Sequence, residues 1–399
     1  MRRLGSVALT LLVAAGGTSM NADAQPIVRV PSATGLPFSE AVVADGLIFV
    51  AGAMGTGENP MQVSGDIATQ TRRTLENIDR TLKAQGSSLE RAVSMMVYLK
   101  NAADFAAMNE VYKTFFPKDP PARTTIVADL VLPEGLVEMS AVALPPGAPR
   151  EVVHPAAWQK SPNPYSYGVK TGDTLFLAGL VARDVRSNAP VSGDIGAQTK
   201  LVLENAGEIL RAAGMSYDDV VSARVFITNG GEFQGMNSAY RPFFGGRKPA
   251  RATVVTGLMS PAYKVEITLV AVKGAREALV TPNADGSPGA PSPNFSSAIK
   301  IGRRLYVAGT LGDTDANKGN MRAETRETLA RIQRTLKLAG CDASCIVDAV
   351  AYITDVSKFG EMNEVWREVF GSNLPARATV KTGLVGESGL IEVMVTAVR

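Results

Sequence analysis

The chain has 399 residues, of which 45% are hydrophobic and 20% are charged, and its formal net charge is +3. This length leaves room for two or three domains, and the composition is typical of a soluble globular protein. The small net charge and the lack of a long run of Lys and Arg argue against a nucleic-acid partner. The single histidine, His154 in a proline-rich stretch, and the two cysteines argue against a histidine- or thiolate-based metal site.

The first 24 residues carry the pattern of a secretory signal peptide. Arg2 and Arg3 form a positive start, residues 4–15 are apolar, and Ala22-Asp23-Ala24 fits a small-residue cleavage site. The apolar run is short for a membrane span, and an uncleaved anchor is the alternative. We therefore expect residues 1–24 to be a signal peptide cleaved after Ala24. The mature protein would be periplasmic or secreted, with no membrane attachment.

The next segment shows alternating strand and helix patterns. Two short apolar runs, at 41–43 and 47–51, are separated by Asp45-Gly46 and predict a hairpin. The following periodicity predicts, in order, a helix at 67–82, a strand at 92–99, a helix at 103–116 and strands at 123–131 and 136–144. The order ββαβαββ predicts an α+β fold with one sheet and both helices on one of its faces.

This order of elements is repeated three times. We assign the repeats to residues 32–144, 162–273 and 293–399. The repeat length is far greater than that of a solenoid unit, so these are tandem domains. The segments between them, 145–161 and 274–292, are rich in Pro, Ala and Gly, as linkers are. Because the strands are apolar on both faces, we expect the three sheets to pack on one another; separate domains on a string are the alternative.

Each repeat also carries the same polar residues at the same spacing. A Pro-Ala-Arg strand holds an arginine with a threonine two residues later; a glutamate follows the arginine by 15 residues (123 to 138, 251 to 266, 377 to 392), and an asparagine precedes it by 14 (109 to 123, 237 to 251, 363 to 377). The residues are Arg123, Arg251 and Arg377; Thr125, Thr253 and Thr379; Glu138, Glu266 and Glu392; and Asn109, Asn237 and Asn363.

These residue types fit the chemistry of a small carboxylate. An arginine binds a carboxylate through two parallel hydrogen bonds, and a glutamate on an apolar strand has a shifted pKa that suits it to proton transfer with water. An asparagine amide orients polar substrate atoms. Together they can hold a 2-imino or 2-enamino acid and deliver water to its C2, which needs positioning and proton transfer but no metal or organic cofactor. The alternative is structural: an Arg–Glu ion pair between neighbouring strands, with the asparagine as a cap or loop contact.

The repeated sequence motifs resemble those of the RidA/YjgF family (Rid superfamily) of enamine/imine deaminases. The resemblance rests on the loop before each hairpin, a strand-end Ala-Gly, the Met-Asn of the second helix, the Pro-Ala-Arg strand and the apolar-Glu-apolar strand. It implies a fold similar to trimeric chorismate mutase, with sites in clefts between adjacent units, so that three fused copies form a pseudo-trimer. It further implies that the arginines bind the substrate carboxylate, the glutamates activate water and the asparagines orient the substrate. The threonines stand where relatives often carry cysteine, and they either donate to a ligand or only favour the strand.

Two features depart from the family pattern. Its catalytic deaminases commonly have a tyrosine in the loop before the hairpin; Tyr165 matches, whereas Phe38 and Phe295 lack the hydroxyl. Where such deaminases have serine before the strand-end glycine, all three repeats have alanine, at Ala51, Ala178 and Ala308. Efficient turnover of small imino acids is then in question, and a larger or less polar substrate, or three non-equivalent sites, would fit.

The resulting hypothesis is an exported deaminase that hydrolyses 2-imino or 2-enamino acids to 2-keto acids and ammonia. A binding protein for small carboxylates is the first alternative, and another hydrolase on the same scaffold, similar to chorismatases or aminomuconate deaminases, is the second. In an exported protein Cys341 and Cys345, four residues apart, are also within reach of a disulfide; two free thiols are the alternative.

Overall fold

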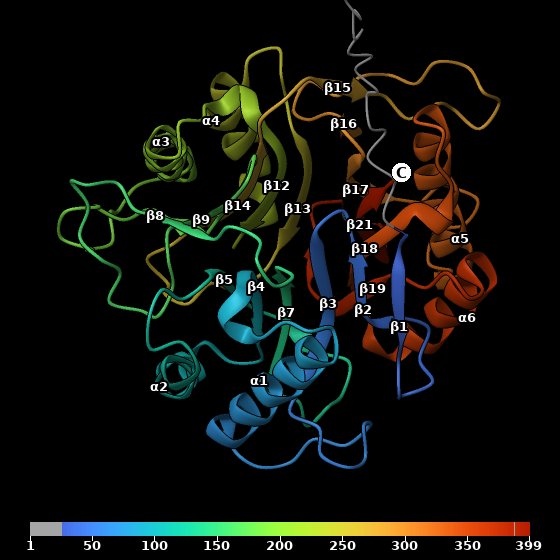
Figure 1. The fold of residues 1–399 in the computed structure, drawn as a ribbon. Coiled ribbons are helices and arrows are strands. Elements are labelled where there is room, and N and C mark those ends of the chain that lie inside the picture. The colour runs from blue at the N-terminus through green and yellow to red at the C-terminus, as the bar shows by residue number, and fades with distance from the viewer. Residues whose placement is uncertain (1–25, 387) are drawn as a thin grey trace, which may run out of the picture.

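The computed structural model describes residues 26–386 and 388–399, and the expected signal peptide lies outside them. The described chain forms three lobes with the same order of elements (Figure 1). Lobe 1 consists of β2 (Ser39–Ala44), β3 (Leu47–Met54), α1 (Ile67–Ala84), β4 (Ala92–Leu99), α2 (Phe105–Phe115), β5 (Ala122–Val127) and β7 (Val137–Ala143).

The other two lobes repeat this order. Lobe 2 consists of β9 (Gly168–Thr171), β10 (Thr174–Leu177), α3 (Ile195–Ala212), β12 (Val220–Ile227), α4 (Phe233–Phe244), β13 (Ala250–Val255) and β14 (Val265–Val272). Lobe 3 consists of β16 (Ala298–Ile301), β17 (Arg304–Leu311), α5 (Met321–Leu338), β18 (Ile346–Ile353), α6 (Phe359–Phe370), β19 (Ala376–Lys381) and β21 (Ile391–Val398). The predicted α+β fold of three tandem ββαβαββ units is confirmed.

The strand expected at 123–131 is shorter than predicted. It ends at Val127, and the next residues form the two-residue strand β6 (Asp129–Leu130), which pairs with β19 of lobe 3. The equivalent short strand of lobe 3, β20 (Gly383–Leu384), pairs with β13 of lobe 2. The last residues of the apolar run therefore pair with a strand of another lobe. The periodicity within one repeat gives no sign of such pairing between lobes.

The first helix of each lobe begins at a capping residue and covers one face of the sheet. Asp66, Asp194 and Asn320 each accept a hydrogen bond from the backbone N–H three residues later. In lobe 1 the apolar face of α1 buries Leu75 and Ile78 in a core shared with β3, β4, β7 and α2. The helices therefore lie at the periphery of the molecule and the sheets lie inside (Figure 1).

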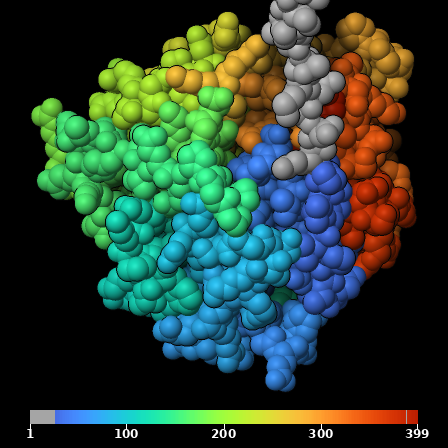
Figure 2. Space-filling model, viewed as in Figure 1, coloured from blue at the N-terminus to red at the C-terminus, as the bar shows by residue number. Residues whose placement is uncertain are grey.

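The opposite faces of the three sheets pack on one another at the centre. Tyr98, Phe226 and Tyr352, from β4, β12 and β18, are fully buried in one apolar cluster that has members from all three lobes. The expectation of an intramolecular pseudo-trimer is thus confirmed, and separate domains on a string are excluded. On the face that the space-filling view shows, the surfaces of neighbouring lobes are in contact (Figure 2).

The lobes are also joined by three equivalent backbone contacts. The backbone N–H of Ser39, Ser166 or Ser296, at the start of each hairpin, donates to the carbonyl of the Pro-Ala-Arg proline of the preceding lobe, at 2.8, 3.1 and 2.9 Å. The hairpin of lobe 1 thereby meets β19 of lobe 3, so that the first lobe closes a ring with the last. Each Pro-Ala-Arg strand is therefore fixed against the hairpin loop of the next lobe.

The two linkers contain ordered strands, which their composition did not predict. β8 (Glu151–Val153) pairs with β9, β15 (Arg276–Leu279) pairs with β16, and the N-terminal β1 (Val28–Pro31) pairs with β2 in the same way. One arginine in or beside each strand, Arg29, Arg150 or Arg276, reaches back to backbone carbonyls of the preceding lobe. For lobe 1 the preceding lobe is lobe 3, because Arg29 donates to the carbonyls of Ser344 and Ile346.

The sequence left open whether the two cysteines pair. Cys341 and Cys345 form a disulfide, with their Cα atoms 6.0 Å apart. Across residues 26–386 and 388–399, no helix has the length and apolar character that a membrane crossing requires.

Candidate functional site

Each candidate site is built from two lobes. In each lobe the arginine strand and the glutamate strand are separated by the strand between them, since the sheets run β5–β4–β7, β13–β12–β14 and β19–β18–β21. The ion pair between neighbouring strands that the sequence left open is therefore not formed within a lobe. Instead each glutamate lies beside the arginine strand of the preceding lobe. We name the clefts 1/2 (Arg123 with Glu266), 2/3 (Arg251 with Glu392) and 3/1 (Arg377 with Glu138).

The arginine of each cleft is buried among aromatic rings. Arg377 is 3% exposed, and its guanidinium carbon lies 4.8 Å from the ring centre of Trp366, 5.7 Å from that of Phe359 and 6.0 Å from that of Phe38. Two of these rings belong to α6 of the same lobe and the third to the hairpin loop of the next lobe. Such a ring cage holds a cation by its electrostatic attraction to the ring faces.

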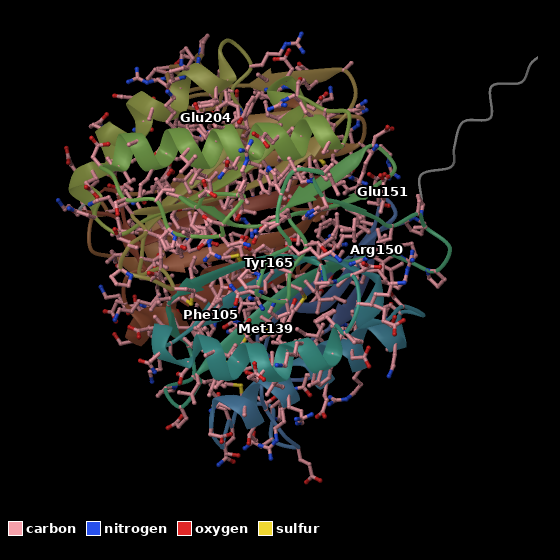
Figure 3. All side chains as sticks on the ribbon, turned by 90° about the vertical axis from the view of Figure 1, so that its left-hand side faces the viewer. Phe105, Met139, Arg150, Glu151, Tyr165 and Glu204 are labelled. Carbon is pink, nitrogen blue, oxygen red and sulfur yellow. A yellow bond between two sulfur atoms is a disulfide. The ribbon has the colours of Figure 1, made fainter. Side chains whose placement is uncertain are left out.

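The other two clefts repeat this cage. Arg123 lies among Phe105, Tyr112 and Tyr165, and Arg251 among Phe233, Tyr240 and Phe295. Figure 3 shows Tyr165 and Phe105 near the boundary between lobes 1 and 2. Tyr165, Phe38 and Phe295, singled out in the sequence, thus occupy equivalent places, and one of the three supplies a hydroxyl.

The aromatic residues that the second helix contributes to the cage were not predicted from the sequence. On the second helix of each lobe an aromatic residue, the asparagine and a second aromatic residue occur at i, i+4 and i+7, a spacing that puts them on one helix face. The pattern is Phe105, Asn109 and Tyr112 in lobe 1, Phe233, Asn237 and Tyr240 in lobe 2, and Phe359, Asn363 and Trp366 in lobe 3. This periodicity is a signal from which the cage could have been predicted.

The asparagine holds the arginine in two of the three clefts. Arg251 and Arg377 each donate from Nη2 to the Oδ1 of Asn237 and Asn363, at 2.7 Å. In the 1/2 cleft, Asn109 instead donates from Nδ2 to Oδ1 of Asn163 in lobe 2, at 3.3 Å. In the 2/3 and 3/1 clefts the asparagine therefore acts through the guanidinium.

The glutamate of each cleft is buried and carries a raised pKa. Burial raises the pKa of Glu138, Glu266 and Glu392 to about 8, while the backbone N–H of the cleft threonine and the charge of the cleft arginine act in the opposite direction. In the 1/2 cleft this N–H belongs to Thr125 and lies 3.4 Å from Oε1 of Glu266. At neutral pH these carboxyl groups are therefore mostly protonated.

The strand-end glycine makes room for that carboxyl group. A Cβ atom on Gly52 would lie 2.0 Å from Oε1 of Glu138, and Gly179 and Gly309 face Glu266 and Glu392 at 1.9 and 1.8 Å in the same way. No side chain fits there, which explains the glycine of the Ala-Gly word. The alanines before it, Ala51, Ala178 and Ala308, are buried and offer no hydroxyl.

Several polar atoms in the clefts are buried without a partner among the described residues. They include Nη1 of all three arginines, Oε2 of Glu138 and Glu392, and Oγ1 of Thr253 and Thr379. A buried polar group without a hydrogen bond is costly, and such groups gather where a ligand binds. Burial lowers the pKa of the three arginines, but a guanidinium remains protonated at neutral pH. Each cleft therefore presents a buried cation beside a neutral acid.

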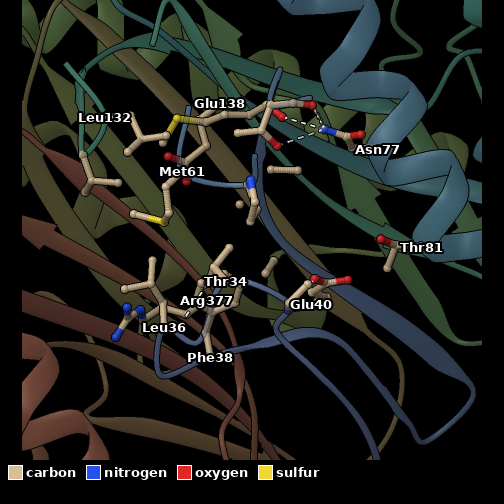
Figure 4. Close-up of a pocket in the computed structure, with 18 of the residues that line it drawn as sticks. Thr34, Leu36, Phe38, Glu40, Met61, Asn77, Thr81, Leu132, Glu138 and Arg377 are labelled. Atoms are coloured by element: carbon tan, nitrogen blue, oxygen red, sulfur yellow. Dashed lines mark hydrogen bonds between the residues drawn. The ribbon is translucent and has the colours of Figure 1, made fainter. Parts of the chain in front are cut away.

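The 3/1 cleft opens into a cavity of about 460 Å³. Phe38, Gly52 and Glu138 of lobe 1 and Arg377 and Thr379 of lobe 3 line it. Figure 4 shows this cavity with Arg377 and Glu138 among the lining residues. Within the described part of the chain no cluster of three or more His, Cys, Asp or Glu side chains is arranged to hold a metal ion.

The comparisons with known proteins agree with this architecture. The family model described as endoribonuclease L-PSP matches residues 29–144, 157–273 and 287–399. The chain therefore belongs to this family, the RidA/YjgF/UK114 family of the Rid superfamily, and contains three copies of its domain. The resemblance seen in the sequence is confirmed.

Individual relatives correspond to one lobe each. A RutC family protein of Sulfurisphaera tokodaii is 40% identical over 115 residues, which is 29% of this chain and 92% of the relative. The RutC family protein UK114 of Drosophila melanogaster is 38% identical over 109 residues, 27% of this chain and 79% of the relative. The crystal structure of a chorismatase is similar over 77% of this chain and 93% of its own, with a TM-score of 0.51 and 15% identity, and so shows the same fold.

Proposed function

We propose that the protein is a cofactor-independent enamine/imine deaminase that hydrolyses 2-imino or 2-enamino acids to 2-keto acids and ammonia. One observation carries the proposal: a buried arginine with an unpartnered Nη1 lies beside a buried carboxyl group of raised pKa, in three clefts between lobes. Membership of the Rid superfamily supports the same reaction class.

The arginine supplies the binding group. Because the neighbouring glutamate is mostly neutral, it leaves the charge of the guanidinium uncompensated. A substrate carboxylate fits this position, since it accepts two parallel hydrogen bonds and brings the missing charge. The ring cage and, in two clefts, the asparagine fix the orientation of the guanidinium before the substrate arrives, which reduces the entropy cost of binding.

The glutamate moves the proton. In its protonated form it donates to the imine nitrogen, which makes C2 more electrophilic, and the resulting carboxylate takes a proton from water as the water oxygen bonds to C2. The carbinolamine so formed receives the proton at its amino nitrogen and gives up its hydroxyl proton as the C–N bond breaks. Ammonia and the 2-keto acid leave, and the glutamate is protonated again.

The test is turnover of imines made in situ by an amino-acid oxidase. We expect the protein to accelerate imine decay and keto-acid formation. A triple Glu→Gln protein should lose about 100-fold in rate, as removal of general acid–base catalysis predicts, and should still bind a 2-keto acid. A triple Arg→Ala protein should lose both imine turnover and keto-acid binding. The residues changed are Glu138, Glu266 and Glu392, and Arg123, Arg251 and Arg377.

The exposed Glu204 on α3 provides the control, because Glu204→Gln removes a carboxylate far from the clefts (Figure 3). No acceleration over a panel of imines, with keto-acid binding that depends on the arginines, would instead favour a binding protein for small carboxylates. Retention of turnover by the triple Arg→Ala protein would overturn the proposal.

The N-terminal pattern supports export as part of the same proposal. We propose that cleavage after Ala24 releases the protein into the periplasm or the medium. Protein recovered from that compartment should begin at Gln25 by N-terminal sequencing. Recovery of the full chain in the cytoplasm alone would contradict this localisation.

A further inference from the structure

The three clefts share their polar residues but differ in the residues around them. The cavity of about 460 Å³ in the 3/1 cleft lies within the range of sites that enclose a drug-sized molecule. Besides Arg377 and Glu138 it is lined by Leu36, Met61 and Leu132. Figure 4 shows Met61 and Leu132 together on one side of the cavity, away from Thr81 on α1.

In the 1/2 cleft aromatic side chains take up the corresponding space. Residues of the two clefts can be matched through Ser39 and Ser166, which make the same backbone hydrogen bond to the preceding lobe. The next residue is Glu40 in lobe 1, where it lines the cavity, and Tyr167 in lobe 2. Tyr167 is buried and packs edge-on against Trp158, with ring centres 4.8 Å apart.

A second difference lies three residues before the glutamate. This position is Gly135 before Glu138 and Tyr263 before Glu266. Tyr263 is 4% exposed, and its hydroxyl accepts a hydrogen bond from Nε of Arg183 at 3.1 Å. A Cβ on Gly135 would lie 3.2 Å from Sδ of Met54, which itself lines the 3/1 cavity, so a larger residue there would crowd the cavity wall.

A third difference concerns the loop that carries Met61, which is shorter in lobe 3, the lobe that supplies the glutamate of the 2/3 cleft. In lobe 1 the segment from Gly52 to the helix cap Asp66 spans 14 positions (52 to 66) and carries Met61. In lobe 3 the segment from Gly309 to the cap Asn320 spans 11 (309 to 320). Beyond Leu311, where β17 ends, residues 312–319 of the shorter loop include no large apolar residue that could match Met61.

We propose that the 3/1 cleft is the specificity site for 2-imino acids with a large apolar side chain, such as the imine of phenylalanine. This inference rests on the proposed function for the reaction, but the cavity assignment can be tested by binding alone. The carboxylate lies on Arg377, and the side chain extends between Leu36, Met61 and Leu132. Methionine is unbranched and polarizable, so it adapts to aromatic and aliphatic chains alike.

The first experiment is calorimetric titration with two 2-keto acids, pyruvate and phenylpyruvate, which stand in for small and large products. We expect one phenylpyruvate site per chain, lost in Arg377→Ala and kept when the same change is made at Arg123. Several equivalent phenylpyruvate sites, or binding that survives Arg377→Ala, would overturn the assignment. This result does not depend on any imine being turned over.

The second experiment compares imines of phenylalanine and alanine. Met61 is 45% exposed at the cavity, and Leu338, 51% exposed on α5, serves as a matched control. Met61→Trp should lower the phenylalanine-to-alanine ratio of kcat/KM by about tenfold, the size of effect that a changed hydrophobic pocket produces, and Leu338→Trp should leave it unchanged. An unchanged ratio in Met61→Trp would overturn the inference. Absence of turnover with either imine would contradict the proposed function, while the titration still decides the cavity assignment.

Discussion

Oε1 of Glu266 in lobe 2 lies 3.4 Å from the backbone nitrogen of Thr125 in lobe 1, which donates a hydrogen bond to it. The carboxyl group of one lobe is thereby placed two residues from Arg123, the arginine of another. Within lobe 2 itself, β12 separates the strands that carry Arg251 and Glu266. A complete set of polar residues therefore exists only where two lobes meet.

The raised pKa of the glutamates predicts the pH dependence of turnover. The pKa of each is about 8 in the free protein, so the proton-donating form decreases as pH rises through that value. Since kcat/KM reports groups of the free enzyme, it should fall above pH 8, and the triple Glu→Gln protein should lack this step. A rate that rises through pH 8 would show that the carboxylate is the active form.

The same groups make stability depend on pH. Their pKa is raised from 4.5 to about 8 by folding, so the folded state holds protons that the unfolded state releases. This contribution to the free energy of unfolding is complete below pH 4.5 and is lost as pH rises to about 8. Denaturant titrations should show this decline in the wild type and a flatter profile in the triple Glu→Gln protein. Parallel profiles would contradict the assignment.

The strand-end glycine should not tolerate a methyl group. In Gly52→Ala the new Cβ would meet Oε1 of Glu138 at 2.0 Å and Cα of Ala378 at 3.2 Å. We expect a loss of about 1–3 kcal/mol in stability, as for other overpacked sites, and loss of activity from the 3/1 cleft. Gly360→Ala is the control, since an alanine Cβ there meets nothing within 4 Å and replaces a helical glycine, a change that favours the helix. Thermal unfolding of both proteins would measure the difference.

The asparagines should differ in their effect on carboxylate binding. Asn363→Ala removes the acceptor that holds Nη2 of Arg377, and the loss of a buried hydrogen bond to a charged group costs about 1.5–3 kcal/mol. Asn109→Ala removes a contact to Asn163 and no bond to Arg123, so its effect on binding should be smaller. Calorimetry with pyruvate compares the two variants. Equal losses would indicate that the asparagine contacts the substrate directly.

Much of the fold could be predicted from the sequence because each lobe follows simple periodicities. The strand at 92–99 and the first helix beginning at Ile67 lie where apolar spacing placed them. The short strands in the linkers escaped prediction because Pro, Gly and Ala dominate those segments. These short strands are held in place because they pair with the edge of the next hairpin. Arginines such as Arg150 also donate hydrogen bonds to carbonyls of the preceding lobe.

The sequence identified the polar residues of the candidate site but did not show which arginine shares a cleft with which glutamate. The 15-residue spacing from Arg251 to Glu266 is the same whether the two share a cleft or lie in different ones, so only the arrangement of the lobes decides. The unequal clefts depend on single substitutions such as Gly135 in one lobe against Tyr263 in another. The effect of such a substitution on the size of a cleft becomes apparent only when equivalent residues of the lobes are compared in the structure.

The pairing of residues across lobes is the central claim, and two four-site variants test it directly. Both keep Arg377 and replace Arg123 and Arg251 with alanine. The first keeps Glu138, and the second keeps Glu392, the glutamate of the same lobe as Arg377; the other glutamates become glutamine. With the imine of phenylalanine as substrate, the first protein should retain most of the wild-type rate, because it keeps the 3/1 cleft intact, and the second should fall to the uncatalysed rate. Equal or greater activity in the second protein would contradict the account.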